Sequence, residues 1–309
     1  MRLLLWLSSG RRAILALGIL LLCGSLAGCG SRDQPRPSVA AAPMPELGAG
    51  HEIEPGVMFH EVSLPRNGDR TTVWIYLPKG ADAEKHLRCI LIAPAGTACI
   101  HGIKLGEGDR PEHLPYARAG FAVVAYELSG SIEDRNDNAA AIRAFKIFSA
   151  AGAGVSDAMA AIDFALAKVP QIDPQRIYAV GHSSAGSVAL LVAEQEPYIK
   201  ACVAFAPRTF LAESLGDAAI QQVSESLPNF RAMVIEESPS TRLQMLQCPL
   251  LLVHAEDDNV VPIQESARFV DQLSKFNKHV TFVRVPSGGH FQTMIDVGIP
   301  RAITWLKSL

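Results

Sequence analysis

Two kinds of hydrophobic run follow one another along the chain. Residues 57–64 and 71–77 are rich in β-branched and aromatic side chains, and they flank the sequence Pro-Arg-Asn-Gly-Asp. An Asn-Gly pair between two such runs predicts an antiparallel β-hairpin. Further along, five short runs are almost continuously apolar, which is typical of strands covered by helices on both faces. These runs are residues 89–93, 121–126, 176–180, 201–206 and 250–254.

Helical patterns alternate with these buried strands. They span residues 137–168 with a break near 152–154, and then 185–195, 263–276 and 291–306, while 280–285 resembles a last strand. This alternation predicts an α/β fold with one mostly parallel central sheet, an N-terminal antiparallel hairpin and helices on both faces. Residues 208–247 interrupt the alternation with apolar residues at helical spacing and two prolines. We expect a small cap insertion of one or two helices there.

Composition excludes two classes of protein. The chain has 309 residues, of which 49% are hydrophobic, so it can bury enough apolar surface to fold and is not intrinsically disordered. Its 28 Lys and Arg residues are nearly balanced by 31 Asp and Glu residues. A nucleic-acid partner requires a clustered basic surface, so we expect none.

The first 28 residues differ from the rest. They hold Arg2, Arg11 and Arg12 and no acidic residue, and an apolar run at 13–22 precedes the sequence Leu-Ala-Gly-Cys that ends at Cys29. A basic flank, a short apolar core and small residues before a cleavage point predict a secretory signal peptide at 1–28. Leu-Ala-Gly-Cys resembles the bacterial lipobox, which implies lipidation of Cys29 and a lipid-anchored protein of the bacterial cell envelope. An uncleaved N-terminal anchor is the alternative.

The rest of the chain divides into a tether and one domain. Residues 29–52 are rich in Pro, Ala and Gly and have no hydrophobic period, so we expect a flexible tether. Residues 53–309 are predicted to form a single catalytic domain. Without the leader, 25 basic residues face 31 acidic ones, which strengthens the exclusion of nucleic acid.

Four cysteines lie in the predicted domain. Cys89, Cys99, Cys202 and Cys248 show neither Cys-x-x-Cys spacing nor a pairing with histidine that would suit a metal. We therefore expect buried thiols and no metal site. A bridge between Cys202 and Cys248 stays open if their strands are neighbours, because an exported compartment permits it.

One short string carries the strongest chemical signal. Gly-His-Ser-Ser-Ala-Gly at 181–186 lies between a buried strand and a helix, where a Gly-x-Ser-x-Gly elbow holds a nucleophilic serine on a strained turn. The positions two before and two after the nucleophile must be small. With Ser183 as nucleophile they are Gly and Ala, whereas with Ser184 one of them would be His182. We therefore expect Ser183; a helix N-cap or a phosphate-binding turn is the alternative.

Two further strings complete a possible catalytic set. Ala-Glu-Asp-Asp-Asn-Val-Val-Pro at 255–262 follows one buried strand, and Gly-Gly-His at 288–290 follows the last strand. A serine needs an imidazole to take its proton and a carboxylate to orient that imidazole. Serine, acid and histidine occur here in that chain order, each just past the carboxyl end of a parallel strand. Such ends share one edge of the sheet, where sites of α/β proteins assemble.

These strings resemble the α/β-hydrolase superfamily over residues 57–309, especially prolyl-oligopeptidase-like and dienelactone-hydrolase-like serine hydrolases. The resemblance implies Ser183 as nucleophile and His290 as base. The pattern small-x-x-Asp-x-x-Val-Pro implies Asp258 rather than Asp257 as the acid. Dienelactone hydrolases use a cysteine nucleophile, so their lactone chemistry is not implied here.

The oxyanion hole departs from the family pattern. The family often has His-Gly after its third strand, but residues 92–97 read Ile-Ala-Pro-Ala-Gly-Thr. Pro94 has no N–H to donate. We expect the Gly96 amide as one donor, with Ala95 and Thr97 as alternatives. The backbone N–H of Ser184, which follows the nucleophile, is the expected second donor.

The remaining histidines and two other polar residues are interpreted from their positions. His182 is expected to pack beside the elbow or to be exposed, and His254 to end a strand in the core. His101 and His113 lie in a charged loop, 99–116, that should cross the active-site edge as a solvated segment or as a substrate contact. Two further residues are candidates by position alone, because each follows a predicted strand: Glu127 and Arg208.

Together these features predict an exported serine hydrolase that cleaves a carboxylic ester through an acyl-enzyme. A peptidase of the prolyl oligopeptidase type is the first alternative, and a non-catalytic binding protein of the cell envelope with the same fold is the second. The ester is favoured because prolyl oligopeptidases carry an added N-terminal module, whereas about 20 tether residues and a hairpin precede this sheet. We expect a small-molecule ester or short peptide as substrate, a membrane contact through Cys29 and no cofactor.

Overall fold

The computed structural model describes residues 44–309 apart from 67–68, 82–85 and 133–136. The predicted signal peptide, the lipidation site Cys29 and most of the predicted tether lie outside the described residues. The first strand begins at His51, two residues before the predicted start of the domain.

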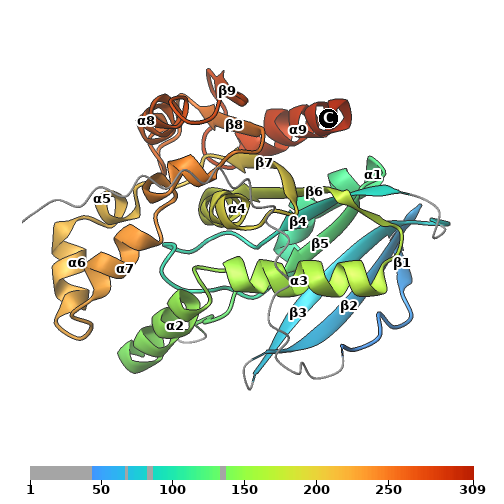
Figure 1. Ribbon diagram of the computed structural model, residues 1–309, viewed down its shortest axis with the longest axis horizontal. Coiled ribbons are helices and arrows are strands. Elements are labelled where there is room, and N and C mark those ends of the chain that lie inside the picture. Colours follow the sequence, from blue (N-terminus) through green and yellow to red (C-terminus); the bar gives the residue numbers. More distant parts are fainter. Residues whose placement is uncertain (1–43, 67–68, 82–85, 133–136) are drawn as a thin grey trace, which may run out of the picture. The chain divides into compact units, whose positions relative to one another are not determined.

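A mixed sheet forms the centre of the fold (Figure 1). Strands β1, β2, β3 and β5 pair antiparallel, and the strands from β5 through β4, β6, β7 and β8 to β9 pair parallel. The N-terminal hairpin and the parallel sheet that the sequence predicts are therefore confirmed. The described residues form nine strands, in the spatial order β1-β2-β3-β5-β4-β6-β7-β8-β9: β1 (His51–Glu54), β2 (Val57–Arg66), β3 (Asp69–Pro78), β4 (Leu87–Ile92), β5 (Ala122–Tyr126), β6 (Ile172–His182), β7 (Ile199–Phe205), β8 (Leu250–Ala255) and β9 (Val280–Val285).

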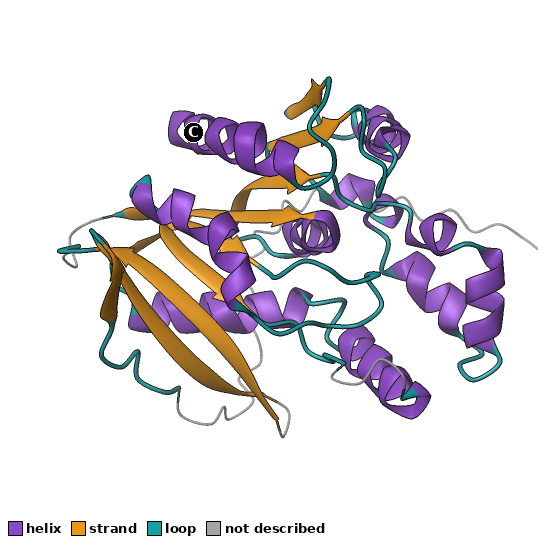
Figure 2. Ribbon diagram, turned by 180° about the vertical axis from the view of Figure 1, so that it is seen from behind, coloured by secondary structure: helices purple, strands orange, loops and turns teal. Residues whose placement is uncertain are grey.

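Helices cover both faces of the sheet, and each face has its own hydrophobic core. Successive side chains of a strand point to opposite faces, so Val123 of β5 joins one core and Val124 joins the other. The first core includes residues of α1 and α9, and the second includes residues of α3, α4 and α8. Figures 1 and 2 show α3 on one side of the hairpin strands, in front in one view and behind in the other. These helices are α1 (Arg110–Arg118), α3 (Val155–Lys168), α4 (Ser183–Gln195), α8 (Ile263–Leu273) and α9 (Ile299–Ser308).

The predicted break in the long helical stretch is present. Helix α2 (Asn138–Ala150) ends before the glycines, and α3 begins after Gly154, whose φ of +91° lies in the left-handed region. A Cβ on Gly154 would lie 2.6 Å from Leu128 Cδ2, so a larger residue would also clash. Within the described residues no single helix suits a membrane span; α2 and α3, bent by 58°, pass that test jointly on length and composition only.

The insertion between β7 and β8 forms the predicted cap, with one helix more than expected. It consists of α5 (Leu211–Leu215), α6 (Asp217–Ser224) and α7 (Phe230–Glu236). The cap packs on α2, where the rings of Phe145 and Phe230 meet edge to face at 4.9 Å. Figure 1 shows these cap helices beside α2.

The prediction of a charged loop at 99–116 is partly wrong. Residues 110–118 form helix α1, with a proline in its first turn and Pro115 inside it. Because of these two prolines and the charged residues, the sequence of α1 shows no clear apolar face, and a helix was not predicted there. His113 is buried against Tyr76 of β3, with its Nδ1 3.4 Å from the phenol oxygen. His113 therefore belongs to the packing between α1 and β3, which favours a structural role over a substrate contact.

Candidate active site

The elbow between β6 and α4 has the backbone that its sequence predicts. Ser183 has a φ of +52°, a strained conformation for a residue with a side chain. The chain passes so close to itself here that a Cβ on Gly181 would lie 2.2 Å from the Ala185 carbonyl oxygen. The tight approach therefore joins positions 181 and 185, which are the flanks expected for Ser183 and not for Ser184.

The two serines of the elbow have different surroundings. Ser183 is partly exposed, and its hydroxyl makes no hydrogen bond to a described residue. Ser184 is buried, with 1% of its surface exposed. Ser183 is thus the more accessible of the two serines. Catalytic hydrogen bonds often tighten only when substrate binds, so the unpaired Ser183 hydroxyl is compatible with proton transfer to a histidine.

Asp258 and His290 come together across the loops that follow β8 and β9. The Nδ1 atom of His290 donates to Asp258 Oδ2 at 2.7 Å. The other carboxylate oxygen accepts from the backbone N–H groups of Val260 and Val261, at 2.8 and 2.9 Å. Burial would raise the pKa of Asp258, but the hydrogen bonds from His290 and these amides outweigh it and hold the pKa below its ordinary value. Asp258 is therefore a carboxylate at neutral pH.

Asp257, the other candidate acid, has a different partner set. Its two oxygens accept from the backbone N–H groups of Gly288 and Gly289, at 3.1 and 2.8 Å. These hydrogen bonds lower its pKa. Asp257 thus fixes the loop that carries His290, and Asp258 alone of the two contacts the imidazole.

A second histidine, His254, also bonds to the Asp258 carboxylate. Its Nε2 lies 3.1 Å from Asp258 Oδ2 and 2.9 Å from the Val261 carbonyl oxygen, and its Nδ1 lies 2.8 Å from Ser266 Oγ. Both Nε2 partners are acceptors, so Nε2 carries the proton and Nδ1 accepts from the serine. His254 lies buried near the end of β8 as expected, and its contact with Asp258 is an additional role that was not predicted. Its spacing, four residues before Asp258 at the end of a strand, was the available signal.

His182 contacts the backbone of His290. Its Nε2 donates to the His290 carbonyl oxygen at 3.0 Å, and the two imidazole rings are 4.6 Å apart. Burial lowers the pKa of His182 to about 4, with a further contribution from nearby His290. His182 is therefore neutral, packed beside the elbow as expected, and it holds the segment that carries His290.

The two residues predicted to supply oxyanion donors, Gly96 and Ser184, are joined by a hydrogen bond that the sequence did not reveal. The backbone N–H groups of Gly96 and Thr97 donate to Ser184 Oγ, at 3.0 and 3.2 Å. The expected donor Gly96 thus lies at the elbow, but its N–H is directed at a side-chain hydroxyl.

The two candidates chosen by position have different roles. Glu127 accepts from the backbone N–H groups of Thr72 and Leu105, at 2.9 and 3.3 Å, so it fixes a loop. Arg208 bridges two parts of the site. Its carbonyl oxygen accepts from Ser187 Oγ at 2.6 Å, and its guanidinium donates to the Val260 carbonyl oxygen at 3.3 Å.

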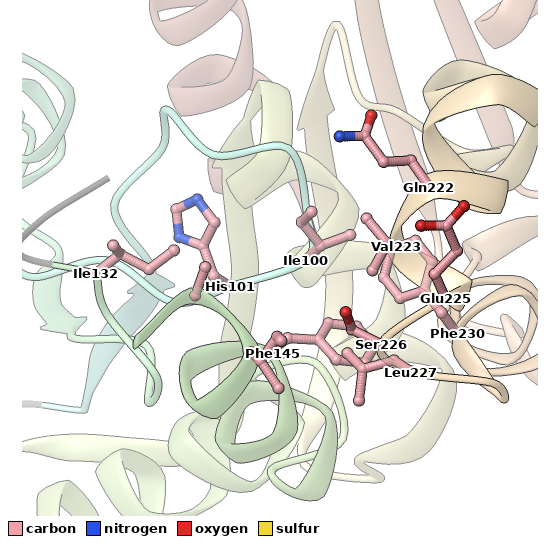
Figure 3. Close-up of a pocket in the computed structure, with 12 residues that line it drawn as sticks. Ile100, His101, Ile132, Phe145, Gln222, Val223, Glu225, Ser226, Leu227 and Phe230 are labelled. Atoms are coloured by element: carbon pink, nitrogen blue, oxygen red, sulfur yellow. The ribbon is translucent and has the colours of Figure 1, made fainter. Parts of the chain in front are cut away.

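A cavity of about 350 Å³ lies between the cap, α2 and the loop after β4 (Figure 3). Most of its lining is apolar, and Figure 3 shows His101 and Glu225 on opposite sides of it. Cys99, next to this lining, has its Sγ 3.7 Å from Ser187 Oγ, one helical turn after Ser183. Cys99 thus links the segment that lines the cavity to the first turns of α4. The apolar lining of the cavity comprises Ile100, Ile132, Ala141, Ile142, Phe145, Val223, Leu227 and Phe230.

The cysteines and possible metal ligands of the described residues were also compared with the sequence-based expectations. Cys89, Cys99, Cys202 and Cys248 are free thiols, three of them buried. No group of three or more His, Cys, Asp or Glu side chains within the described ranges could hold a metal ion.

Comparison with known proteins places this site in a family. The model of the prolyl oligopeptidase family matches residues 110–303. The chain is 24% identical over 255 residues to "Uncharacterized peptidase YuxL" of Bacillus subtilis (strain 168), covering 78% of this chain and 37% of that protein. The chain thus spans less than two fifths of the length of this curated relative.

Solved structures share the fold. An acylaminoacyl peptidase of Pyrococcus horikoshii superposes with a TM-score of 0.63 at 18% identity, over 82% of this chain and 40% of that chain. A cold-adapted esterase from an Arctic intertidal metagenomic library superposes with a TM-score of 0.58 at 18% identity, over 86% of this chain and 99% of that chain. Peptidases and esterases both occur among these neighbours. With the family model matching residues 110–303, the chain belongs to the prolyl oligopeptidase family of α/β-hydrolases.

Proposed function

We propose that this protein is a serine hydrolase that cleaves carboxylic esters through an acyl-enzyme. The proposal is carried by the 2.7 Å hydrogen bond between His290 and Asp258, at the sheet edge where the strained and partly exposed Ser183 also lies. A serine hydroxyl is a weak nucleophile until a base takes its proton. The elbow presents the nucleophile, and the acid loop holds the imidazole in the tautomer that leaves Nε2 free to accept.

The reaction proceeds in two halves. Ser183 Oγ attacks the ester carbonyl carbon while His290 Nε2 takes the hydroxyl proton, and the carbonyl oxygen becomes an oxyanion. Collapse of this intermediate expels the alcohol, which takes the proton from His290. A water molecule then attacks the acyl-enzyme with His290 again as base, which releases the acid and restores Ser183. Asp258 stabilises the imidazolium in both halves.

The choice of an ester over a peptide rests on the cavity under the cap. Its largely apolar lining suits the acyl chain or aromatic ring of an ester, and its volume of about 350 Å³ is that of a small-molecule site. A peptide would also need hydrogen-bond partners for its backbone. Membership of the prolyl oligopeptidase family favours the alternative, a peptidase.

A panel of p-nitrophenyl esters and aminoacyl-p-nitroanilides separates the two activities. We expect higher kcat/KM on the esters, rising from the acetate to longer acyl chains that reach the cavity. Faster turnover of an anilide would make the peptidase the better assignment. A non-catalytic binding protein would turn over neither class and would form no covalent adduct at Ser183.

We also propose that the protein is exported and anchored to a bacterial membrane by a lipid on Cys29. The basic residues, the apolar run and the Leu-Ala-Gly-Cys sequence support this proposal. The test is labelling with a fatty-acid probe in a bacterial host, followed by fractionation. We expect label in the membrane fraction for the natural sequence and neither label nor cleavage for Cys29→Ser. An unlabelled natural protein would refute lipidation, and one found in the cytosol would refute export.

A further inference from the structure

The Ser184 hydroxyl occupies the point where two backbone amides converge. Its Oγ accepts from Gly96 N at 3.0 Å and from Thr97 N at 3.2 Å. Both amides belong to the loop after β4, which was expected to supply an oxyanion donor. The serine is 1% exposed and directly follows the partly exposed Ser183, so the contact is an internal one at the elbow.

The number of hydrogen bonds that a hydroxyl can make shows which group of Ser184 is still free to bond. A serine oxygen has two lone pairs and one proton to donate. The two amides occupy both lone pairs, and no described residue accepts the remaining proton. Two donors that polarise one oxygen also strengthen the bond that its own proton can make. Ser184 thus has an unused, activated O–H immediately beside the nucleophile.

The backbone N–H of Ser184 is a second potential donor to an oxyanion. It lies in the first turn of α4, where N–H groups have no partner within the helix. In an elbow of this kind the N–H that follows the nucleophile faces the oxyanion. One residue can therefore offer two donors, an amide and a hydroxyl, to a single oxygen atom.

We propose that the Ser184 hydroxyl is a catalytic oxyanion donor, and that the Gly96 and Thr97 amides act through it instead of touching the oxyanion. This inference rests on the proposed hydrolase function. It replaces the direct Gly96 donor of the sequence analysis with a relay in which both loop amides hold and polarise Ser184 Oγ. In an alternative arrangement the hydroxyl only blocks Gly96, and its removal would then free that amide for the oxyanion.

Substitutions at Ser184 separate these two arrangements. Removing one oxyanion donor typically lowers kcat by about 10²- to 10³-fold. We expect Ser184→Ala to lower kcat on a p-nitrophenyl ester by about 10²-fold or more, with little change in KM. Ser184→Thr retains the hydroxyl and should recover much of this loss. Ser274→Ala is the control, because its hydroxyl donates to the Val270 carbonyl at the end of α8, away from the elbow.

A trifluoromethyl ketone gives a readout that loss of folding cannot imitate. Ser183 Oγ adds to the ketone carbon, His290 takes the hydroxyl proton, and the carbonyl oxygen becomes a stable oxyanion. We expect its Ki to rise in Ser184→Ala by the same factor as kcat/KM falls, while the thermal melting midpoint stays near that of the natural protein. If Ser184→Thr does not fold, this Ki alone decides.

The outcomes are distinct. A kcat in Ser184→Ala equal to or above that of the natural protein, or an unchanged Ki, would overturn the inference and leave the hydrolase proposal standing. A natural protein that neither turns over an ester nor reacts with a fluorophosphonate at Ser183 would instead refute the hydrolase proposal.

Discussion

The Nδ1 atom of His290 lies 2.7 Å from Oδ2 of Asp258, and this hydrogen bond joins two loops 32 residues apart in the chain. The bond fixes which nitrogen of His290 carries the proton and leaves Nε2 free to act as a base. A substitution that preserves shape but removes the charge tests this relationship.

Asp258→Asn should therefore lower kcat by about 10⁴-fold with little change in fold, because an amide can favour the wrong tautomer. The neighbouring Asp257→Asn is the matched comparison. Its oxygen can still accept from the Gly288 or Gly289 amide, so we expect a loss of less than about tenfold. Steady-state kinetics on one ester measures both. Equal losses in the two variants would contradict the assignment of Asp258.

His254 donates to the same Asp258 oxygen, Oδ2, that accepts from His290. His254→Leu removes a buried donor from the Asp258 carboxylate while keeping a similar volume. Hydrogen bonds to charged groups contribute about 1.5–3 kcal/mol, so we expect kcat to fall by about 10- to 100-fold. The exposed His279→Leu provides the control, measured by kcat and melting temperature. An unchanged kcat in His254→Leu would show that the contact has no part in orienting the acid.

Buried carboxyl groups predict how stability changes with pH. Burial, with a smaller contribution from Asp109, raises the pKa of Glu112 to about 8, and burial raises that of Glu237 to about 7. A carboxyl whose folded pKa is raised stabilises the protein at low pH and loses that contribution as pH rises through the window up to the folded pKa. The contribution of each group to the free energy of unfolding should thus fall by about 1.4 kcal/mol per pH unit, from about pH 5 to about 8 for Glu112 and from about pH 5 to about 7 for Glu237.

Glu112→Gln should flatten this slope, because its amide does not ionise. Urea unfolding at several pH values between 5 and 8 measures the effect. The same substitution at the exposed Glu225 is the control. A slope that is unchanged in Glu112→Gln would mean that this side chain ionises freely in the folded protein.

Filling the cavity under the cap tests its part in substrate choice. Ser226 is exposed at the lining, so Ser226→Trp can fill part of the space without disturbing the core. We expect kcat/KM to fall at least tenfold for a long-chain or aromatic ester and to change little for an acetate, since burial of each lost CH₂ contributes about 0.8 kcal/mol. Gln221→Trp places the same ring on α6 outside the lining. Equal effects of both substitutions, or equal effects on both substrates, would exclude the cavity as the acyl pocket.

Much of the fold was predictable from hydrophobic pattern alone. Buried strands such as β5 and β8 are continuous apolar runs, and their carboxyl ends identify the edge where Ser183, Asp258 and His290 lie. Helix α1 was not predictable in the same way. Its buried face includes Glu112 and His113, which have the appearance of a solvated loop in sequence.

The supporting residues of the site were hidden for a related reason. Polar groups such as His254 acquire their role from partners that folding brings close, here a carboxylate held by its own loop amides. The Ser184 contact depends on a loop about 88 residues earlier in the chain, so the order of residues does not reveal it. Strand ends predict where a site forms, whereas hydrogen-bond partners become apparent only in three dimensions.

The most direct test of the proposed activity is covalent labelling of the purified mature protein with a fluorophosphonate, followed by mass spectrometry of the peptide that contains the elbow. We predict one adduct, located on Ser183, that is lost in Ser183→Ala and strongly slowed in Asp258→Asn. An adduct on Ser184, or no adduct on a folded protein, would contradict the assignment of Ser183 as the nucleophile.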